Sequence, residues 1–188
     1  TGVGSWNVHI GKQAGEAQTI ASSNVFVGGR AGIDVTQGEN NVAIGRDAFY
    51  TATTSGKNVL VGGWAGNAIA AGQTDTDGTV AIGYAAGKDI TSAQRSVLVG
   101  HEAGTNISTS DDNTAIGYNA MHGNDSTATT GTGRNTAIGS SALYAITTGQ
   151  QNVAIGGSAG STLTTTSHTV LIGHNAGLAI NSADADGT

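Results

Sequence analysis

Proline and cysteine are absent from this 188-residue sequence, aromatic residues make up only 4% of it, and charged residues only 11%. Without cysteine there is no disulfide framework, and the sequence does not report a redox compartment. With so few large apolar side chains the chain is unable to fill a thick globular core. Its backbone segments are therefore expected to approach one another closely around a thin interior of small residues. The low charge also argues against a disordered chain.

Basic residues are scarce as well, with 7 Lys and Arg against 13 Asp and Glu and a net charge of −6. Because neutralising phosphate requires clustered Lys and Arg, we expect no nucleic acid and no anionic membrane surface as a partner. No stretch approaches the roughly 18 apolar residues of a membrane span, so no membrane insertion is expected. No signal peptide is evident and the sequence begins at Thr1, which we interpret as a processed or excised piece.

Glycine, in contrast, occurs 31 times and marks an internal repeat. The repeat reads small polar residue, Val or Thr, any residue, Ile or Val, Gly, two variable residues, Ala. Successive repeat glycines are separated by 17 residues in seven of nine intervals, and by 21 and 22 residues in the other two. They are Gly11, Gly28, Gly45, Gly62, Gly83, Gly100, Gly117, Gly139, Gly156 and Gly173. Such regularity predicts ten stacked copies of one unit.

Each column of the repeat indicates a structural role. The residues one and three before the glycine are β-branched in all ten copies, which predicts a short strand with these side chains pointing inward. The alanine three residues after the glycine fits a site with room for one methyl group. An apolar residue seven after the glycine, as in Val35 and Ile69, predicts a second short strand. The glycine suits a sharp turn, and the frequent Asn before the strand suits a stacked ladder of amides.

The middle residue of the predicted strand is apolar too, as Phe26, Leu60, Leu98, Leu171 or alanine, with His9 as the polar exception. A strand that is apolar on both sides is buried on both sides. We therefore expect this second side to pack on another chain, and favour an oligomeric rod over a monomeric solenoid.

The predicted fold is all-β: a tandem-repeat β-solenoid or trimeric β-roll of ten 17-residue units, with two loop insertions at residues 72–78 and 122–134. Residues 1–188 form a single repeat array. The final residues 184–188 (DADGT) match residues 75–79 (DTDGT), after which the next unit begins at once. This favours either a segment of a longer fibre or an eleventh unit contributed by another molecule.

The string Val-Ala-Ile-Gly-x-x-Ala at residues 42–48, 80–86 and 153–159 resembles the head repeats of YadA-like trimeric adhesins. Asn-Thr-Ala-Ile-Gly, at residues 113–117 and 135–139, is similar to shaft repeats of bacteriophage tail fibres. The resemblance extends over nearly the whole chain, although the adhesin unit is usually shorter. It implies a homotrimer, an extracellular location on a virion or cell surface, and a role in attachment to a cell-surface or glycan receptor.

Two Asp-x-Asp-Gly tips form a candidate calcium site, with Asp75, Asp77, Asp184 and Asp186 as ligands, because paired carboxylates on a glycine turn suit this ion. The alternative is a solvated turn. The five histidines and the many Ser and Thr suggest no catalytic set, and a hexapeptide acyltransferase coil would need 18 residues, so we expect no enzyme and no other cofactor. Trp6 and Trp64 stand near repeat turns and are candidates for stacking on a sugar, although a packed turn is the favoured role.

Three function classes follow. The first is a non-catalytic structural or adhesive fibre segment of a virion tail fibre or bacterial surface adhesin. The second is a subunit of a self-assembling extracellular filament. The third is a ligand- or ice-binding monomeric β-solenoid, which needs a flat face of regularly spaced Thr, whereas Thr and Ser here seem to cluster in turns without a regular column.

Overall fold

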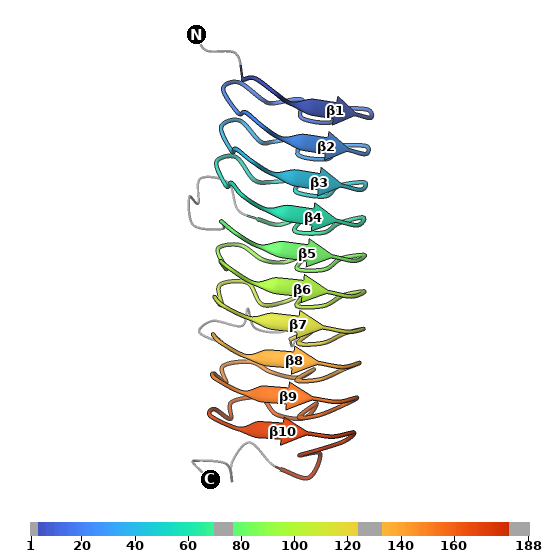
Figure 1. Cartoon of the computed structure of the whole chain (residues 1–188), viewed down its shortest axis with the longest axis vertical. Coiled ribbons are helices and arrows are strands. Elements are labelled where there is room, and N and C mark those ends of the chain that lie inside the picture. Colours follow the sequence, from blue (N-terminus) through green and yellow to red (C-terminus); the bar gives the residue numbers. More distant parts are fainter. Residues whose placement is uncertain (1–3, 70–76, 124–132, 181–188) are drawn as a thin grey trace.

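The computed structural model describes residues 4–69, 77–123 and 133–180 and contains ten short strands that form one parallel sheet. The strands are β1 (Val8–Ile10), β2 (Val25–Val27), β3 (Val42–Ile44), β4 (Val59–Val61), β5 (Val80–Ile82), β6 (Val97–Val99), β7 (Thr114–Ile116), β8 (Thr136–Ile138), β9 (Val153–Ile155) and β10 (Val170–Ile172). They follow one another in chain order, each pairing in register with the next (Figure 1). The predicted β-solenoid of 17-residue coils is confirmed.

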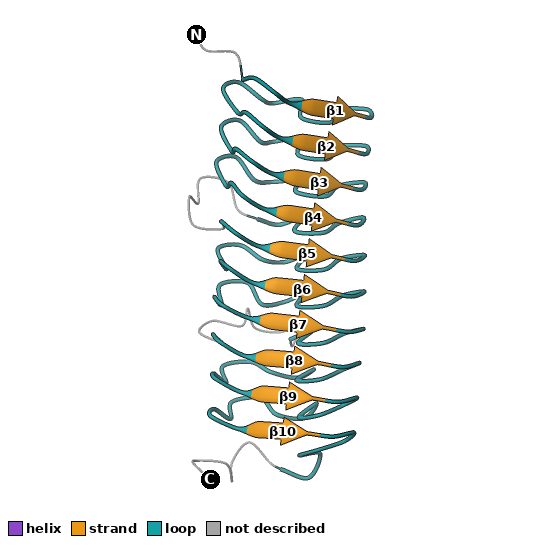
Figure 2. Ribbon diagram, viewed as in Figure 1, coloured by secondary structure: helices purple, strands orange, loops and turns teal. Residues whose placement is uncertain are grey.

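Each coil contains one strand, and turns complete the rest of the circuit (Figure 2). None of the described residues is helical. The apolar residues seven after the repeat glycine, such as Val35 and Ile69, are fully buried but lie outside the strands. The prediction of a second strand is therefore wrong, while the inward direction of these side chains is confirmed.

The inward and outward sides of the strands are the reverse of our prediction. The middle residues of β2 to β9, among them Phe26, Leu60 and Leu98, are fully buried in the single core that runs along the coils. The flanking Val, Ile and Thr residues point outward and are half-buried or exposed. A three-residue strand places its outer two side chains on one side, and here the wider turn region lies on the other. The middle residue therefore meets the core.

Two positions in each coil share one volume of the core. Where the middle strand residue is large, glycine stands four residues after the repeat glycine. A Cβ on Gly32 would lie 2.5 Å from the Phe26 ring, and one on Gly66 would lie 2.9 Å from a Leu60 methyl. Where the middle residue is alanine, a large side chain often fills the space instead. Such pairs are Ala43 with Phe49, Ala115 with Met121, and Ala137 with Leu143, all fully buried.

The column of repeat glycines brings the backbones of neighbouring coils into contact. Gly83 has φ +140°, and a Cβ built there would lie 2.2 Å from the carbonyl oxygen of Gly100. Only glycine fits such a position, which confirms the predicted turn and close approach.

The predicted ladder of asparagine side chains is also present. The Oδ1 atom of Asn41 accepts hydrogen bonds from the backbone N–H of Asn58 at 3.0 Å and from its side-chain Nδ2 at 3.2 Å. Asn41 Nδ2 in turn donates to the carbonyl of Ser55 at 3.0 Å. The column continues through Thr79 and Ser96 to Asn113, Asn135 and Asn152, all buried. Because each side chain bonds both across its own coil and to the next coil, the ladder fixes the 17-residue register.

Candidate functional surfaces

The outward side of the sheet is the largest apolar surface of the described structure. Its two columns hold the first and third residues of all ten strands, and of these only Thr114 and Thr136 are not Val or Ile. Ile82 is 39% exposed and Ile116 38%, and at the last strand Ile172 reaches 69%. We call this surface the Val/Ile face. From the spacing of strands it is about 43 Å long and roughly 10 Å wide.

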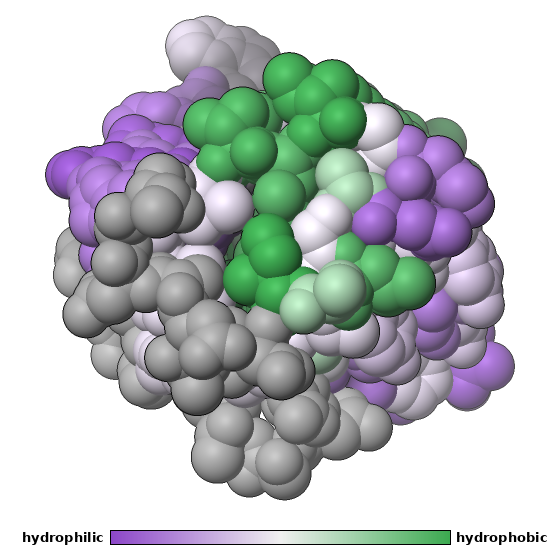
Figure 3. All heavy atoms as spheres, turned by 90° about the horizontal axis from the view of Figure 1, so that it is seen from below, coloured by the Kyte–Doolittle hydropathy of each residue, from purple (hydrophilic) through white to green (hydrophobic). Residues whose placement is uncertain are grey.

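Viewed along the axis onto the β10 end, apolar residues extend through the middle of the last coil to the outline of the molecule, with hydrophilic residues on both flanks (Figure 3). The Val/Ile face thus borders polar turns on either side. Sequence reasoning expected an outward apolar stripe but placed Phe26, Leu60, Leu98 and Leu171 in it. In the structure these four side chains pack within their own chain.

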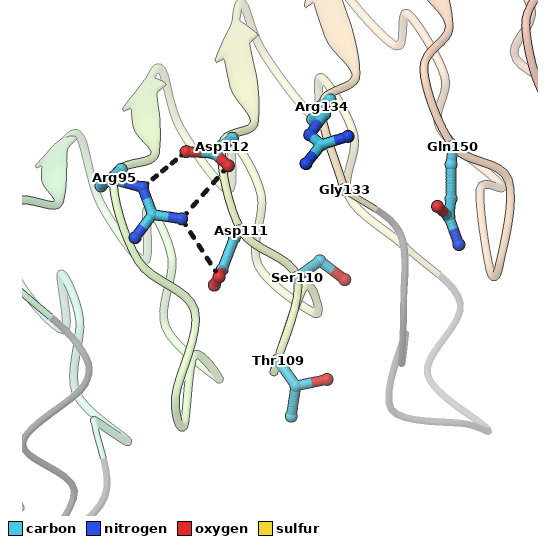
Figure 4. A pocket seen from close by; sticks show the side chains of 8 residues that line it. All are labelled: Arg95, Thr109, Ser110, Asp111, Asp112, Gly133, Arg134 and Gln150. Atoms are coloured by element: carbon cyan, nitrogen blue, oxygen red, sulfur yellow. Dashed lines mark hydrogen bonds and ion pairs between the residues drawn. The ribbon is translucent and has the colours of Figure 1, made fainter.

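A polar hollow of about 340 Å³ lies among the turns that precede β6 to β9 (Figure 4). Arg95 donates from Nε to Asp112 at 2.7 Å and from Nη2 to Asp112 at 3.2 Å and to Asp111 at 3.3 Å. The hydrogen bond from Arg95 lowers the pKa of the Asp112 carboxyl below its ordinary value of 3.8, and the charge of the nearby Arg134 acts in the same direction. These groups are engaged with one another, which makes the hollow a rigid ion-pair cluster.

A second polar hollow, of about 320 Å³, includes Asp77 of the predicted calcium site. Asp77 Oδ1 accepts a hydrogen bond from the backbone N–H of Gly56 at 2.8 Å, and Oδ2 lies 3.3 Å from Lys57 Nζ. Asp75, Asp184 and Asp186 lie outside the described residues. Within residues 4–69, 77–123 and 133–180 no three His, Cys, Asp or Glu side chains are grouped to hold a metal ion. Calcium binding at the Asp-x-Asp-Gly tips stays a prediction, for which calorimetric titration with calcium is the direct measurement.

The turns that follow the strands form an edge of the rod beyond the arrowheads of Figure 1. All four tyrosines, Tyr50, Tyr84, Tyr118 and Tyr144, lie in these turns together with Trp64, and we call this surface the aromatic edge. The rings stack from coil to coil. Ring centroids are 5.2 Å apart for Tyr84 and His101, 5.5 Å for His101 and Tyr118, and 5.2 Å for His122 and Tyr144. Sequence reasoning singled out only Trp64 here, although the turn positions of the tyrosines were visible in the repeat.

Threonine does form a regular column, contrary to our expectation. The hydroxyls of Thr19, Thr36, Thr91 and Thr147 each donate to the backbone carbonyl of the residue 17 positions later, at 2.9 to 3.2 Å. The column therefore links neighbouring coils. Because these hydroxyls bind the backbone, the column contributes to the stack and offers little to ice or another ligand.

No helix in the described part of the chain is long and apolar enough to span a membrane. No family model, curated protein or solved structure matches the chain.

Proposed function

We propose that the chain is a non-catalytic segment of an extracellular fibre, of the virion tail-fibre or bacterial adhesin kind, and that it assembles with copies of itself through the Val/Ile face. The observation that carries this proposal is the exposure of ten strands' worth of Val and Ile along one straight surface. Soluble monomers rarely expose continuous apolar patches of several hundred Å².

The shape of the Val/Ile face favours a coaxial bundle. A strip about 43 Å long and only about 10 Å wide suits chains that lie side by side around a common axis, since closed symmetry then covers every copy of the strip. The resemblance to trimeric adhesins favours three copies. A rigid rod with coils in fixed register is also the mechanical element that such a fibre requires.

The polar borders of the face support the same arrangement. On one side lie ion pairs such as Arg95 with Asp112, and on the other lie the stacked rings of the aromatic edge. An apolar centre flanked by polar groups is typical of protein–protein interfaces. The bundle would bury the Val and Ile side chains and leave the turns in water.

Sedimentation velocity of the purified chain tests the proposal. We expect a closed oligomer, with three chains favoured, at micromolar concentration. Ile82→Asp combined with Ile116→Asp should dissociate it while circular dichroism remains that of a β-protein, because both side chains point away from the core. Gln37→Asp combined with Gln150→Asp adds the same charge on exposed turns and should leave the oligomer intact. A monomeric wild-type chain would refute the proposal, and open-ended polymers would favour the filament instead.

A further inference from the structure

The exposed rings of the aromatic edge have no role in the core. Tyr84 is 53% exposed, Tyr118 56% and Tyr144 39%, whereas the two phenylalanines of the chain, Phe26 and Phe49, are fully buried. Tyrosines placed for stability alone would be expected to turn inward like the phenylalanines. The turns that precede the strands hold ion pairs and hydroxyls instead. The gathering of tyrosines on one edge therefore calls for a role in recognition.

Polar side chains accompany the rings in a fixed pattern. The residue two after one repeat glycine contacts the residue five after the next one: Arg30 lies 5.2 Å from the ring of Tyr50, and Lys88 Nζ lies 5.5 Å from that of Trp64. At the third such place Glu102 Oε2 lies 3.8 Å from His122 Nε2. His122 Nδ1 is 3.0 Å from the carbonyl of Gly123, which orients the ring. Each aromatic group thus has hydrogen-bonding groups at its rim.

Tyr118 and Tyr144 form the open end of this array. Each is the last ring of its stack, and in the following coil the equivalent positions hold Ser140 and Ser161. One face of each ring is therefore covered by histidine, and the other looks over a small hydroxyl side chain. Asn119, which occupies the position of Glu102 in this coil, has a buried Oδ1 atom without a hydrogen-bond partner. Two open ring faces, two serines and a free amide oxygen make a ledge.

We propose that the aromatic edge, with the ledge at Tyr118 and Tyr144 as its principal site, binds a neutral linear polysaccharide of β-linked pyranoses. Such sugars carry their hydroxyls around the ring and present flat C–H faces, which pack on aromatic rings while the hydroxyls bond to side chains at the rim. From Trp64 to Tyr144 the edge spans about four strand spacings, or about 19 Å, long enough for several sugar units in a line parallel to the rod.

The observations favour a sugar over other polymers. Single-stranded nucleic acid also stacks on aromatic side chains, but it needs a positively charged groove, and here the net charge is −6 and Lys88 is accompanied by Asp89 at 4.0 Å. A protein partner would be expected to bury a continuous apolar patch, whereas the rings stand in small groups separated by polar residues. The inference rests on the proposed role as an adhesive fibre and names the class of receptor.

Titration calorimetry of the assembled chain with cellohexaose and chitohexaose tests the site, with a sulfated heparin hexasaccharide as the charged comparison. We expect a neutral hexasaccharide to bind, and Tyr118→Ala with Tyr144→Ala to weaken it at least about tenfold. Tyr118→Phe should bind more tightly than Tyr118→Ala because the ring remains. Trp6→Ala removes an exposed ring, 86% exposed, on the side of the rod that precedes the strands and should leave binding unchanged.

The failure of this proposal is separable from that of the fibre. Absence of binding to both neutral oligosaccharides by an intact oligomer overturns the site and leaves the assembly standing. Dissociation of the oligomer by the tyrosine substitutions also overturns it, since the edge would then be a contact between chains. Preference for the heparin hexasaccharide would identify an electrostatic surface instead of a stacking one. Retention of sugar binding by the dissociated Ile82→Asp, Ile116→Asp chain supports the site even where the assembly fails.

Discussion

Left-handed backbone conformations recur in every coil, and large side chains accept them at a few places. Phe49, Met121 and Leu143 have φ between 48° and 56°, at a position where most coils have glycine. A left-handed non-glycine residue costs about 1–2 kcal/mol. Each of the three side chains is fully buried beside an alanine-centred strand. Burial of a large apolar side chain contributes about 1.5–3 kcal/mol, which offsets the strain.

Exchange of the large side chain between the two positions of one coil should therefore preserve stability better than either single change. Phe49→Gly should cost about 3–5 kcal/mol because it leaves a cavity next to Ala43. Ala43→Leu alone should cost about 1–3 kcal/mol through overpacking against Phe49. The double variant recreates the arrangement of Leu60 with Gly66 and should recover at least half of the summed loss. Urea unfolding of the four proteins gives the coupling energy, and strictly additive effects would show that the two positions do not share a volume.

The repeat glycine and the residue after it provide a matched pair at the scale of one strand and its turn. Gly28 has φ +135°, and a Cβ would lie 2.6 Å from the carbonyl oxygen of Gly45, whereas a Cβ on Gly29 would meet nothing within 4 Å. Gly28→Ala should destabilise by about 3 kcal/mol or more, since the neighbouring backbone has to move. Gly29→Ala should be neutral or slightly stabilising. Thermal melts of both variants decide the point, and equal melting temperatures would mean that the coils adjust freely.

The ion pair between consecutive turns predicts a pH dependence. Because the pKa of Asp112 is lower in the folded chain than its ordinary 3.8, its contribution to stability is present above that pH and is lost as the pH falls through the folded value. Carbon-13 NMR titration should find the Asp112 carboxyl titrating below 3.8, and Arg95→Gln should raise its pKa. Arg134→Gln should raise it less, since Arg134 acts through charge without a hydrogen bond. An unchanged titration in Arg95→Gln would contradict the assigned cause.

The sequence alone predicts the coil but not the side of each strand that faces the core. The glycine spacing and the asparagine column dictate a 17-residue register because each has one stereochemical use. In contrast, Val80, Ala81 and Ile82 are all apolar, and three residues contain no polar alternation that distinguishes inside from outside. The signal that does distinguish them is the inverse size relation between the middle residue and the residue five positions after the strand ends, as in Leu60 with Gly66. The aromatic edge needed the structure because its contacts join different coils.

Across the whole rod every strand touches only its neighbours in the chain. Stability in such an array is approximately a sum of coil and interface contributions, and a local defect should remain local. Leu98→Ala, which removes a fully buried side chain from β6, should cost about 2–5 kcal/mol.

Hydrogen exchange locates that loss. We expect faster exchange of amides in β5, β6 and β7 and little change in β2 and β3 at the far end of the stack. The exposed Val97→Ala on the same strand serves as the control and should disturb exchange far less. Uniform acceleration along all ten strands would indicate a single cooperative unit and would contradict the nearest-neighbour description.

The strands lie across the long axis of the rod, and the two ends of the chain leave from opposite ends of the stack (Figure 1). A pulling force between those ends is therefore carried by the hydrogen bonds between successive coils in series. The outermost coil peels away first while the others keep their partners. Each 17-residue coil that detaches releases about 60 Å of extended chain. Under load the rod would lengthen in equal steps, and would dissipate work as a shock absorber that can rewind from its remaining coils.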